Sequence, residues 1–144
     1  MIDLILQLAW PLHLASTFYM VGLIWFVQVV HYPLFAAVGE DKFVAYEDHH
    51  QRLTTWVVGP GMLIELVTGV LLALAAAYGR SATILWASMG LLAVIWLSTA
   101  LIQIPYHRQL SSGFDASAHQ RLVRSNWLRT VAWTVRGVLI LVLV

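Results

Sequence analysis

Glu65 lies in an otherwise uncharged apolar stretch, residues 56–77, whose length fits a helix that crosses a lipid bilayer. Arg129 and Arg136 fall inside another apolar stretch near the C-terminus. Ionisable side chains in hydrocarbon are costly and normally face a partner, a cavity or a cofactor. We therefore predict that all three residues are catalytic. Glu65 would carry a proton or bind a ligand, while the two arginines would neutralise an anionic substrate or haem propionates. We also expect Glu65 to pair with one of the two arginines.

Further polar side chains recur at helical spacing near these charges. Residues three or four apart on a helix share one face, so each set can point into a common interior. We predict that four such residues bind substrate: Gln28, Gln103, Asn126 and Trp133. There are more polar groups than hydrogen bonding between helices for structural purposes alone would need. The simpler interpretation, that they only satisfy one another, stays open.

The six histidines supply candidate metal ligands. We place His31, His50 and His107 near one membrane surface, where with Glu65 they would suit iron, copper or zinc by ligand type. His13 stands apart in apolar surroundings, where a neutral imidazole could ligate haem iron. The predicted cofactor is haem b at His13, with non-haem iron or copper at the other three histidines as the alternative. Interfacial histidines are also common as purely structural residues.

The composition is that of a membrane protein. Of the 144 residues, 60% are hydrophobic and only 10% are charged, whereas a soluble domain carries about 25% charged residues. The chain has no cysteine, which excludes disulfides and thiolate chemistry. A formal charge of +1 gives no reason to expect nucleic-acid binding. The lipid bilayer is therefore the expected partner.

The elements that must position these residues are four apolar helices. We predict an all-α integral membrane four-helix bundle in which residues 1–144 form a single domain. The expected spans are residues 4–35, 56–78, 82–106 and 124–144. Between the first two spans, Phe43, Tyr46, His50 and Leu53 recur at helical spacing. That pattern predicts a short amphipathic helix lying in the membrane interface within residues 39–55 and running into the second span.

The basic residues near the spans predict the orientation of the bundle. The two long links between spans hold five of them: Lys42, Arg52, Arg108, Arg121 and Arg124. The opposite side has Arg80 alone. Because basic residues favour the cytoplasmic side, we expect a multi-pass protein of the bacterial inner-membrane type. Both long links would be cytoplasmic, and both termini would lie outside.

Loose motifs on three of the helices add a family resemblance. They are His13 with Tyr19-Met20-Val21-Gly22-Leu23 and Tyr32-Pro33, Pro60-Gly61-Met62 with Thr68-Gly69, and Arg121, Arg124 and Asn126 with Arg129-Thr130. With these the chain resembles the small four-helix membrane proteins grouped around the HemJ-type protoporphyrinogen oxidase, the copper-resistance CopD domain and anthrone-oxygenase-like proteins. By that resemblance, His13 matches the haem-ligating histidine of the HemJ type.

The chain also departs from that pattern. Residues 84–88 lack the lysine that the third helix of the HemJ type carries near its start. Glu65 and Arg136 have no counterpart that we can place in that enzyme. The resemblance therefore implies a shared architecture more than a shared activity.

Together these features predict a small membrane oxidoreductase, or haem- or metal-binding protein. Its site would lie inside the bundle and take a small hydrophobic or quinone-like substrate. The alternative is a small dimeric proton-coupled transporter or channel that uses Glu65, and a third is a scaffold with no chemistry. A homo-oligomer is compatible with each of these functions.

Overall fold

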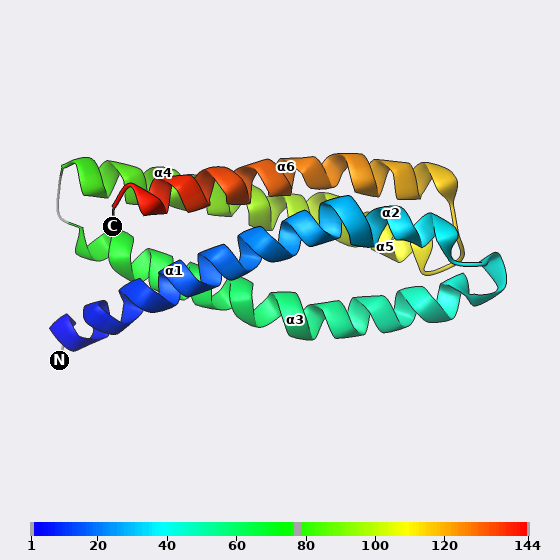
Figure 1. Ribbon diagram of the computed structural model, residues 1–144, viewed down its shortest axis with the longest axis horizontal. Helices are drawn as coiled ribbons and strands as arrows, with labels where there is room; N and C mark the ends of the chain where they lie inside the picture. Colours follow the sequence, from blue (N-terminus) through cyan, green and yellow to red (C-terminus); the bar gives the residue numbers. More distant parts are fainter. Residues whose placement is uncertain (1, 77–78, 144) are drawn as a thin grey trace.

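The structure is a computed structural model that describes residues 2–76 and 79–143, and within those ranges it contains helices and no strand. The helices form four long rods, which confirms the predicted all-α class (Figure 1). The first rod is α1 (Ile2–Phe26), continued by the π-helix η1 (Val27–His31), α2 (Tyr32–Leu34) and the 3-10 helix η2 (Phe35–Ala37). The second rod is α3 (Glu40–Ala75). The third comprises α4 (Arg80–Ser98), the π-helix η3 (Thr99–Gln103) and α5 (Ile104–Leu110), and the fourth is α6 (Ala116–Leu141).

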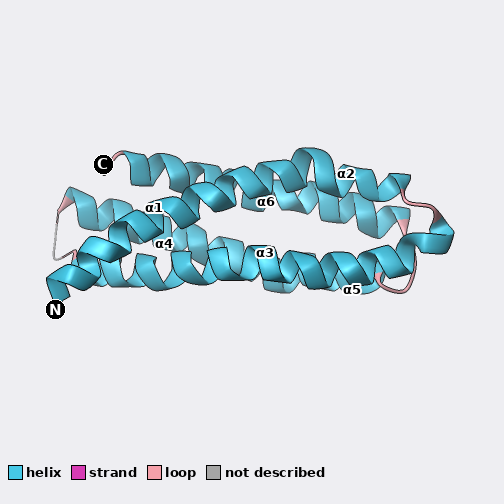
Figure 2. Cartoon of the chain, turned by 60° about the horizontal axis from the view of Figure 1, so that its bottom comes forward, coloured by secondary structure: helices cyan, strands magenta, loops and turns pink. Residues whose placement is uncertain are grey.

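The four rods run lengthwise beside one another (Figures 1 and 2). Both ends of the chain lie at one end of the bundle, with the last turns of α3 and the first turns of α4. The connections from η2 to α3 and from α5 to α6 lie at the opposite end, which we call the link end. This arrangement brings together the parts of the first three rods that carry most of the predicted histidine ligands.

Three of the rods are long and apolar enough to cross a membrane: Asp3–Ala37, Glu40–Ala75 and Ser81–Leu110. The fourth expected span, in α6, is not among them, because this helix carries four arginines: Arg121, Arg124, Arg129 and Arg136. The 36 residues of α3 correspond to about 54 Å at 1.5 Å per residue. A hydrocarbon core of about 30 Å is much shorter than that. The described part of the bundle is therefore longer than the apolar layer that it would cross.

Residues 40–55 form the first part of α3, with no break before the apolar part of the helix. The structure therefore differs from the predicted short helix in the membrane interface, because this segment continues the axis of the second rod. Its apolar residue Phe43 is buried, while Asp41, Asp48 and Arg52 are exposed. The prediction that this segment is helical is confirmed. Its apolar face is buried against the other rods of the bundle.

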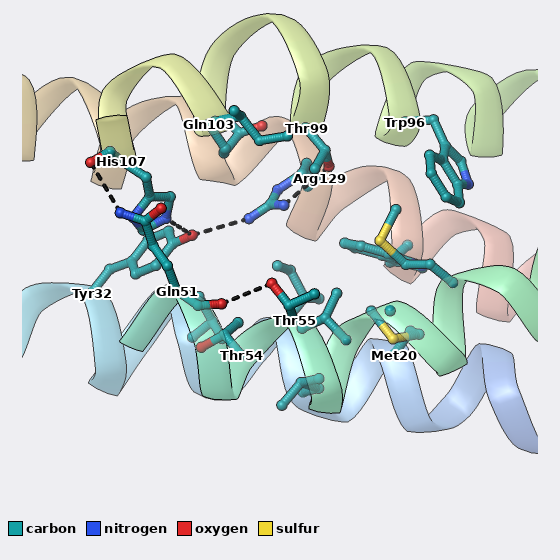
Figure 3. A pocket seen from close by; sticks show the side chains of 18 of the residues that line it. Met20, Tyr32, Gln51, Thr54, Thr55, Trp96, Thr99, Gln103, His107 and Arg129 are labelled. Atoms are coloured by element: carbon teal, nitrogen blue, oxygen red, sulfur yellow. Dashed lines mark hydrogen bonds between the residues drawn. The ribbon is translucent and has the colours of Figure 1, made fainter. Parts of the chain in front are cut away.

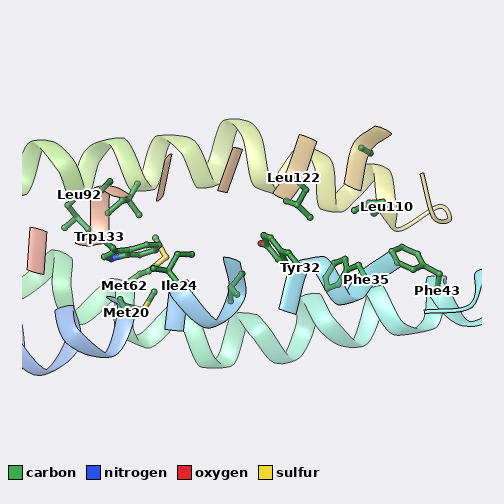
Figure 4. Packing of buried hydrophobic residues seen from close by; sticks show 14 residues of the cluster. Met20, Ile24, Tyr32, Phe35, Phe43, Met62, Leu92, Leu110, Leu122 and Trp133 are labelled. Atoms are coloured by element: carbon green, nitrogen blue, oxygen red, sulfur yellow. The ribbon is translucent and has the colours of Figure 1, made fainter. Parts of the chain in front are cut away.

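Apolar side chains fill the space between the rods along most of their length (Figure 4). Trp133, Met20 and Met62 pack in the middle of the bundle, and Phe35 and Phe43 pack near the link end. The cluster is interrupted by buried polar residues from every rod. Those residues form the sites described next.

Each π-helical turn is followed, after one residue, by a proline: Pro33 after η1 and Pro105 after η3. Proline has no N–H, and its ring clashes with the carbonyl group four residues earlier in an α-helix. A π turn relieves this conflict by widening the helix locally, and such turns are frequent at functional sites. Each one holds a buried glutamine, Gln28 in η1 and Gln103 in η3.

Candidate functional site

A cavity of about 340 Å³ lies between the rods, between the middle of the bundle and the link end (Figure 3). One end of the cavity is polar, and the other is lined by methionine and tryptophan side chains. The polar side chains that line the cavity include Tyr32, His50, Gln51, Gln103, His107 and Arg129, and the apolar ones include Met20, Met62, Trp96 and Trp133. Leu63 of α3 and Ile104 of α5 also line the cavity and are exposed on the bundle surface. The cavity therefore reaches the surface between α3 and α5.

A hydrogen-bonded chain runs across the polar end from α3 to α2. The carboxylate oxygen Oε1 of Glu47 lies 2.6 Å from Nδ1 of His107, and Nε2 of His107 lies 2.9 Å from the Tyr32 hydroxyl. Gln51 donates from Nε2 to the same Glu47 oxygen at 3.1 Å. Glu47 is fully buried, and its second oxygen, Oε2, has no hydrogen-bond partner among the described residues.

Two further histidines adjoin this chain. Nε2 of His31 and Nδ1 of His50 are 2.8 Å apart, and the Thr54 hydroxyl lies 3.1 Å from the same His50 nitrogen. The ring centroids of His50 and His107 are 5.1 Å apart and the rings are stacked. Because Nδ1 of His50 already has these two partners, Nε2 is the nitrogen that remains for a ligand.

Glu47, His50 and His107 form a three-residue set suited to a metal ion. One ligand atom from each of them lies within 4.8 Å of the others. In a tetrahedral site with zinc–nitrogen bonds of about 2.0–2.1 Å, two ligand atoms lie about 3.4 Å apart, so the three side chains would move closer together on binding an ion. Because both ring nitrogens of His107 have hydrogen-bond partners, an ion would replace one of these hydrogen bonds. Imidazole and carboxylate ligands suit iron, copper and zinc. Of the predicted metal ligands, the structure thus brings His50 and His107 together. His31 is not part of this set, but it contacts Nδ1 of His50, the nitrogen already occupied by hydrogen bonds.

The sequence reasoning missed Glu47, because it lies in a segment rich in charged residues. A signal was available, since Glu47 and His50 are three residues apart on α3 and therefore share a helix face. Phe43, one turn before Glu47, marks the same face as buried.

Arg129 lies at the boundary between the polar and apolar parts of the cavity (Figure 3). It donates to Oδ1 of Asn126 from Nε at 2.9 Å and from Nη2 at 2.5 Å. It also donates from Nη1 to the Thr99 hydroxyl at 3.1 Å and from Nη2 to the Tyr32 hydroxyl at 3.3 Å. Asn126 in turn donates to Oε1 of Gln28 at 2.9 Å. The side chains of Asn126 and Gln28 therefore hold the guanidinium group in place.

Two of the four residues predicted to bind substrate, Gln103 and Trp133, line the cavity. Gln103 accepts a hydrogen bond from Ser98 at 2.9 Å and donates to Ser125 at 3.2 Å. The other two predicted residues, Gln28 and Asn126, do not line this cavity; Asn126 contacts Arg129, and Gln28 contacts Asn126.

Glu65 and Arg136 form a second polar cluster, deeper in the bundle. Nη1 of Arg136 donates to Oε1 of Glu65 at 2.5 Å, and the Trp133 indole donates to Oε2 at 2.9 Å. Nε of Arg136 donates to the Ser88 hydroxyl at 3.1 Å. The expected pairing of Glu65 with an arginine is therefore present, and the partner is Arg136. The indole ring of Trp133 separates this pair from Arg129, whose Cζ lies 5.9 Å from the ring centroid.

His13 lies apart from both the cavity and the metal-ligand set. It is buried, and its Nδ1 lies 2.9 Å from the Thr68 hydroxyl. A Cβ atom at Gly69 would come within 3.1 Å of the His13 ring, which shows how closely α3 packs against it. His13 does not line the cavity described above. The surroundings of His13 therefore do not fit a haem ligand.

The chain matches no protein-family model, no curated protein and no solved structure. The resemblance to the HemJ, CopD and anthrone-oxygenase-like proteins therefore stays a prediction. The geometry of the two polar clusters and the cavity is therefore the basis for a functional proposal.

Proposed function

We propose that this protein is an integral membrane oxidoreductase with a non-haem metal ion, iron or copper, held by Glu47, His50 and His107. Its substrate would be a small hydrophobic or quinone-like molecule bound in the adjacent cavity. The observation that carries the proposal is the buried Glu47 carboxylate, which has one oxygen without a partner beside two histidines.

A buried carboxylate oxygen without a hydrogen-bond partner is unfavourable, because burial removes its hydration. A metal cation bound at this oxygen would supply the missing interaction and balance the negative charge. His31 supports the same assignment, because metal-binding histidines commonly use their second ring nitrogen for a hydrogen bond that orients the ring.

The cavity supports the substrate class. His50 and His107 belong both to the metal-ligand set and to the lining of the cavity, so an ion and a bound molecule would be neighbours. Its volume lies at the small end of the range of ligand pockets, about 300–1,000 Å³. The exposed apolar side chains of Leu63 and Ile104 at its rim support entry of a hydrophobic molecule from the lipid.

Metal analysis of purified protein tests the proposal. We expect protein loaded with ferrous or cupric ion in detergent, then freed of loose metal, to retain about one ion per chain. His50→Ala and His107→Ala should lose most of that metal. His49→Ala is the matched control, because His49 is the exposed neighbour of His50 and contacts only a backbone carbonyl of its own helix. Wild-type protein without metal, or equal metal in all four proteins, would contradict the proposal.

The second candidate function is a proton-coupled transporter that uses Glu65. The observation that favours it is the buried Glu65–Arg136 pair in an apolar helix, because ionisable residues inside a membrane often mark a proton path. Proton uptake into liposomes that contain the purified protein would distinguish the two. Uptake that Glu65→Gln abolishes and His107→Ala leaves intact would favour the transporter.

A further inference from the structure

The Arg129 guanidinium is buried at the wall of the cavity without a carboxylate partner among the described residues. Its three hydrogen-bond partners, Asn126, Thr99 and Tyr32, offer neutral amide or hydroxyl groups, and Trp133 presents its ring. The hydrogen-bonded chain from Arg129 reaches Glu47 only beyond Tyr32 and His107. Arg136, by contrast, has Glu65 as its direct counter-ion. The structure therefore separates two arginines that the sequence left equivalent.

One N–H group of Arg129 also remains without an acceptor. A guanidinium group has five N–H donors in a planar arrangement. Its four hydrogen bonds use one donor on Nε, two on Nη2 and one on Nη1. The second donor on Nη1 is therefore unused within the described part of the chain. Arg129 therefore presents both a positive charge and a free N–H donor at the wall of the cavity.

We propose that the cavity binds a small hydrophobic monocarboxylate, with its carboxylate at Arg129 and its apolar body among Met20, Met62 and Trp96. The proposal rests on the proposed function and narrows its substrate to a hydrophobic acid in place of a neutral quinone-like molecule, but the binding itself does not require the metal. One carboxylate oxygen can accept the free N–H of Arg129, and such charge-assisted hydrogen bonds are among the strongest in proteins.

The charge of Arg129 favours an acid over a neutral molecule of the same shape. A neutral carbonyl group could accept the free N–H, but it would leave the buried charge without a counter-ion, which is unfavourable in a site shielded from water. An inorganic anion would satisfy the charge and leave the apolar part of the cavity unfilled. Only a molecule that has both an anionic group and an apolar body satisfies Arg129 and also fills the apolar part of the cavity.

Two kinds of molecule share this chemistry, namely an alkyl chain such as a lipid-derived acid and an aromatic acid. Isothermal titration of the purified protein in detergent should therefore use octanoate and 1-naphthoate, each compared with its neutral amide. We expect at least one of the two acids to bind wild-type protein about tenfold or more tightly than its amide. The acid that binds identifies the kind of body that the cavity accepts.

Arg129→Gln should remove the preference for acid over amide, whereas Arg124→Gln should keep it. Arg124 is the matched control, because it lies on the same helix and is exposed. Met62→Trp should weaken binding of acid and amide alike by filling the apolar end, which keeps the test open if the Arg129 variant does not fold. Equal binding of acid and amide to wild-type protein, or no binding of either acid, would overturn the proposal. Metal content measured on the same samples reports separately on the metal site.

Discussion

Arg136 and Glu65 form an ion pair in which both side chains are completely buried, although they come from two different rods of the bundle. Trp133 donates to the second carboxylate oxygen, and Ser88 accepts from Nε of the arginine. The pair therefore connects α3, α4 and α6 through three hydrogen bonds. Its loss should affect the whole bundle.

Glu65→Gln should destabilise the protein by about 3–5 kcal/mol, because it leaves the buried charge of Arg136 without a partner. Denaturant unfolding in detergent measures this loss. The double variant Glu65→Gln with Arg136→Gln should recover part of it, since neither charge is then buried alone. Glu40→Gln is the matched control, because Glu40 is exposed, and its cost should stay within about 1 kcal/mol. A Glu65→Gln variant as stable as wild type would contradict this interpretation.

Gly69→Val should destabilise the protein by about 1–3 kcal/mol through overpacking. A Cβ atom at this position would lie 2.7 Å from Sδ of Met89 and 3.1 Å from the His13 ring. His13 cannot move freely, because Thr68 holds its Nδ1. Gly90→Val is the control, since a Cβ atom there has nothing within 4 Å, and it should change the free energy of unfolding by less than about 0.5 kcal/mol. Equal effects of both substitutions would mean that α3 does not pack closely on His13.

Some of these relationships could be predicted from the sequence and others could not. The apolar surroundings of Glu65 predicted a buried partner, because hydrocarbon offers the carboxylate no other. The identity of the partner was beyond the sequence, since Arg129 and Arg136 are seven residues apart and share a helix face. Only the packing of Trp133 between them decides which arginine reaches Glu65.

Only part of the proposed metal-ligand set, Glu47, His50 and His107, could be predicted from the sequence, because its formation also depends on packing between helices. His50 and His107 were identified by residue type, whereas Glu47 resembled its exposed neighbours Asp41 and Asp48. The spacing of Phe43, Glu47 and His50 marks one helix face, but it does not indicate that α5 is the element that packs against that face. The two π turns also depend on packing, although Pro33 and Pro105 marked the places where a regular helix would be interrupted.

His31→Ala should weaken metal binding about 10- to 100-fold without abolishing it. His31 contacts the nitrogen of His50 that faces away from the proposed ion, so it orients the ring and does not bind the metal itself. Titration against a chromogenic chelator measures the affinity. A complete loss of binding would make His31 a direct ligand, and unchanged affinity would exclude a role in orienting His50.

The orientation in the membrane is testable with single cysteines, because the chain has none of its own. Ser81→Cys and Ser112→Cys place a thiol at opposite ends of the bundle, and both serines are exposed. In intact bacterial cells, a membrane-impermeant maleimide should label position 81 and leave position 112 unlabelled until the cells are opened. The reverse pattern would invert the predicted orientation.

The π turns make the bundle tolerant of one change in chain length and sensitive to another. Each one accommodates one residue more than a regular α-helical turn, and so absorbs a rotation of about 100° that an extra residue would otherwise cause. Deleting a single residue within Val27–His31 would therefore restore a regular helix and leave Tyr32 and Phe35 facing the interior. A further insertion in the same place would exceed what one wide turn absorbs and would turn both residues away. The alignment of Tyr32 with His107 and Arg129 thus withstands the loss of one residue here but not the gain of one.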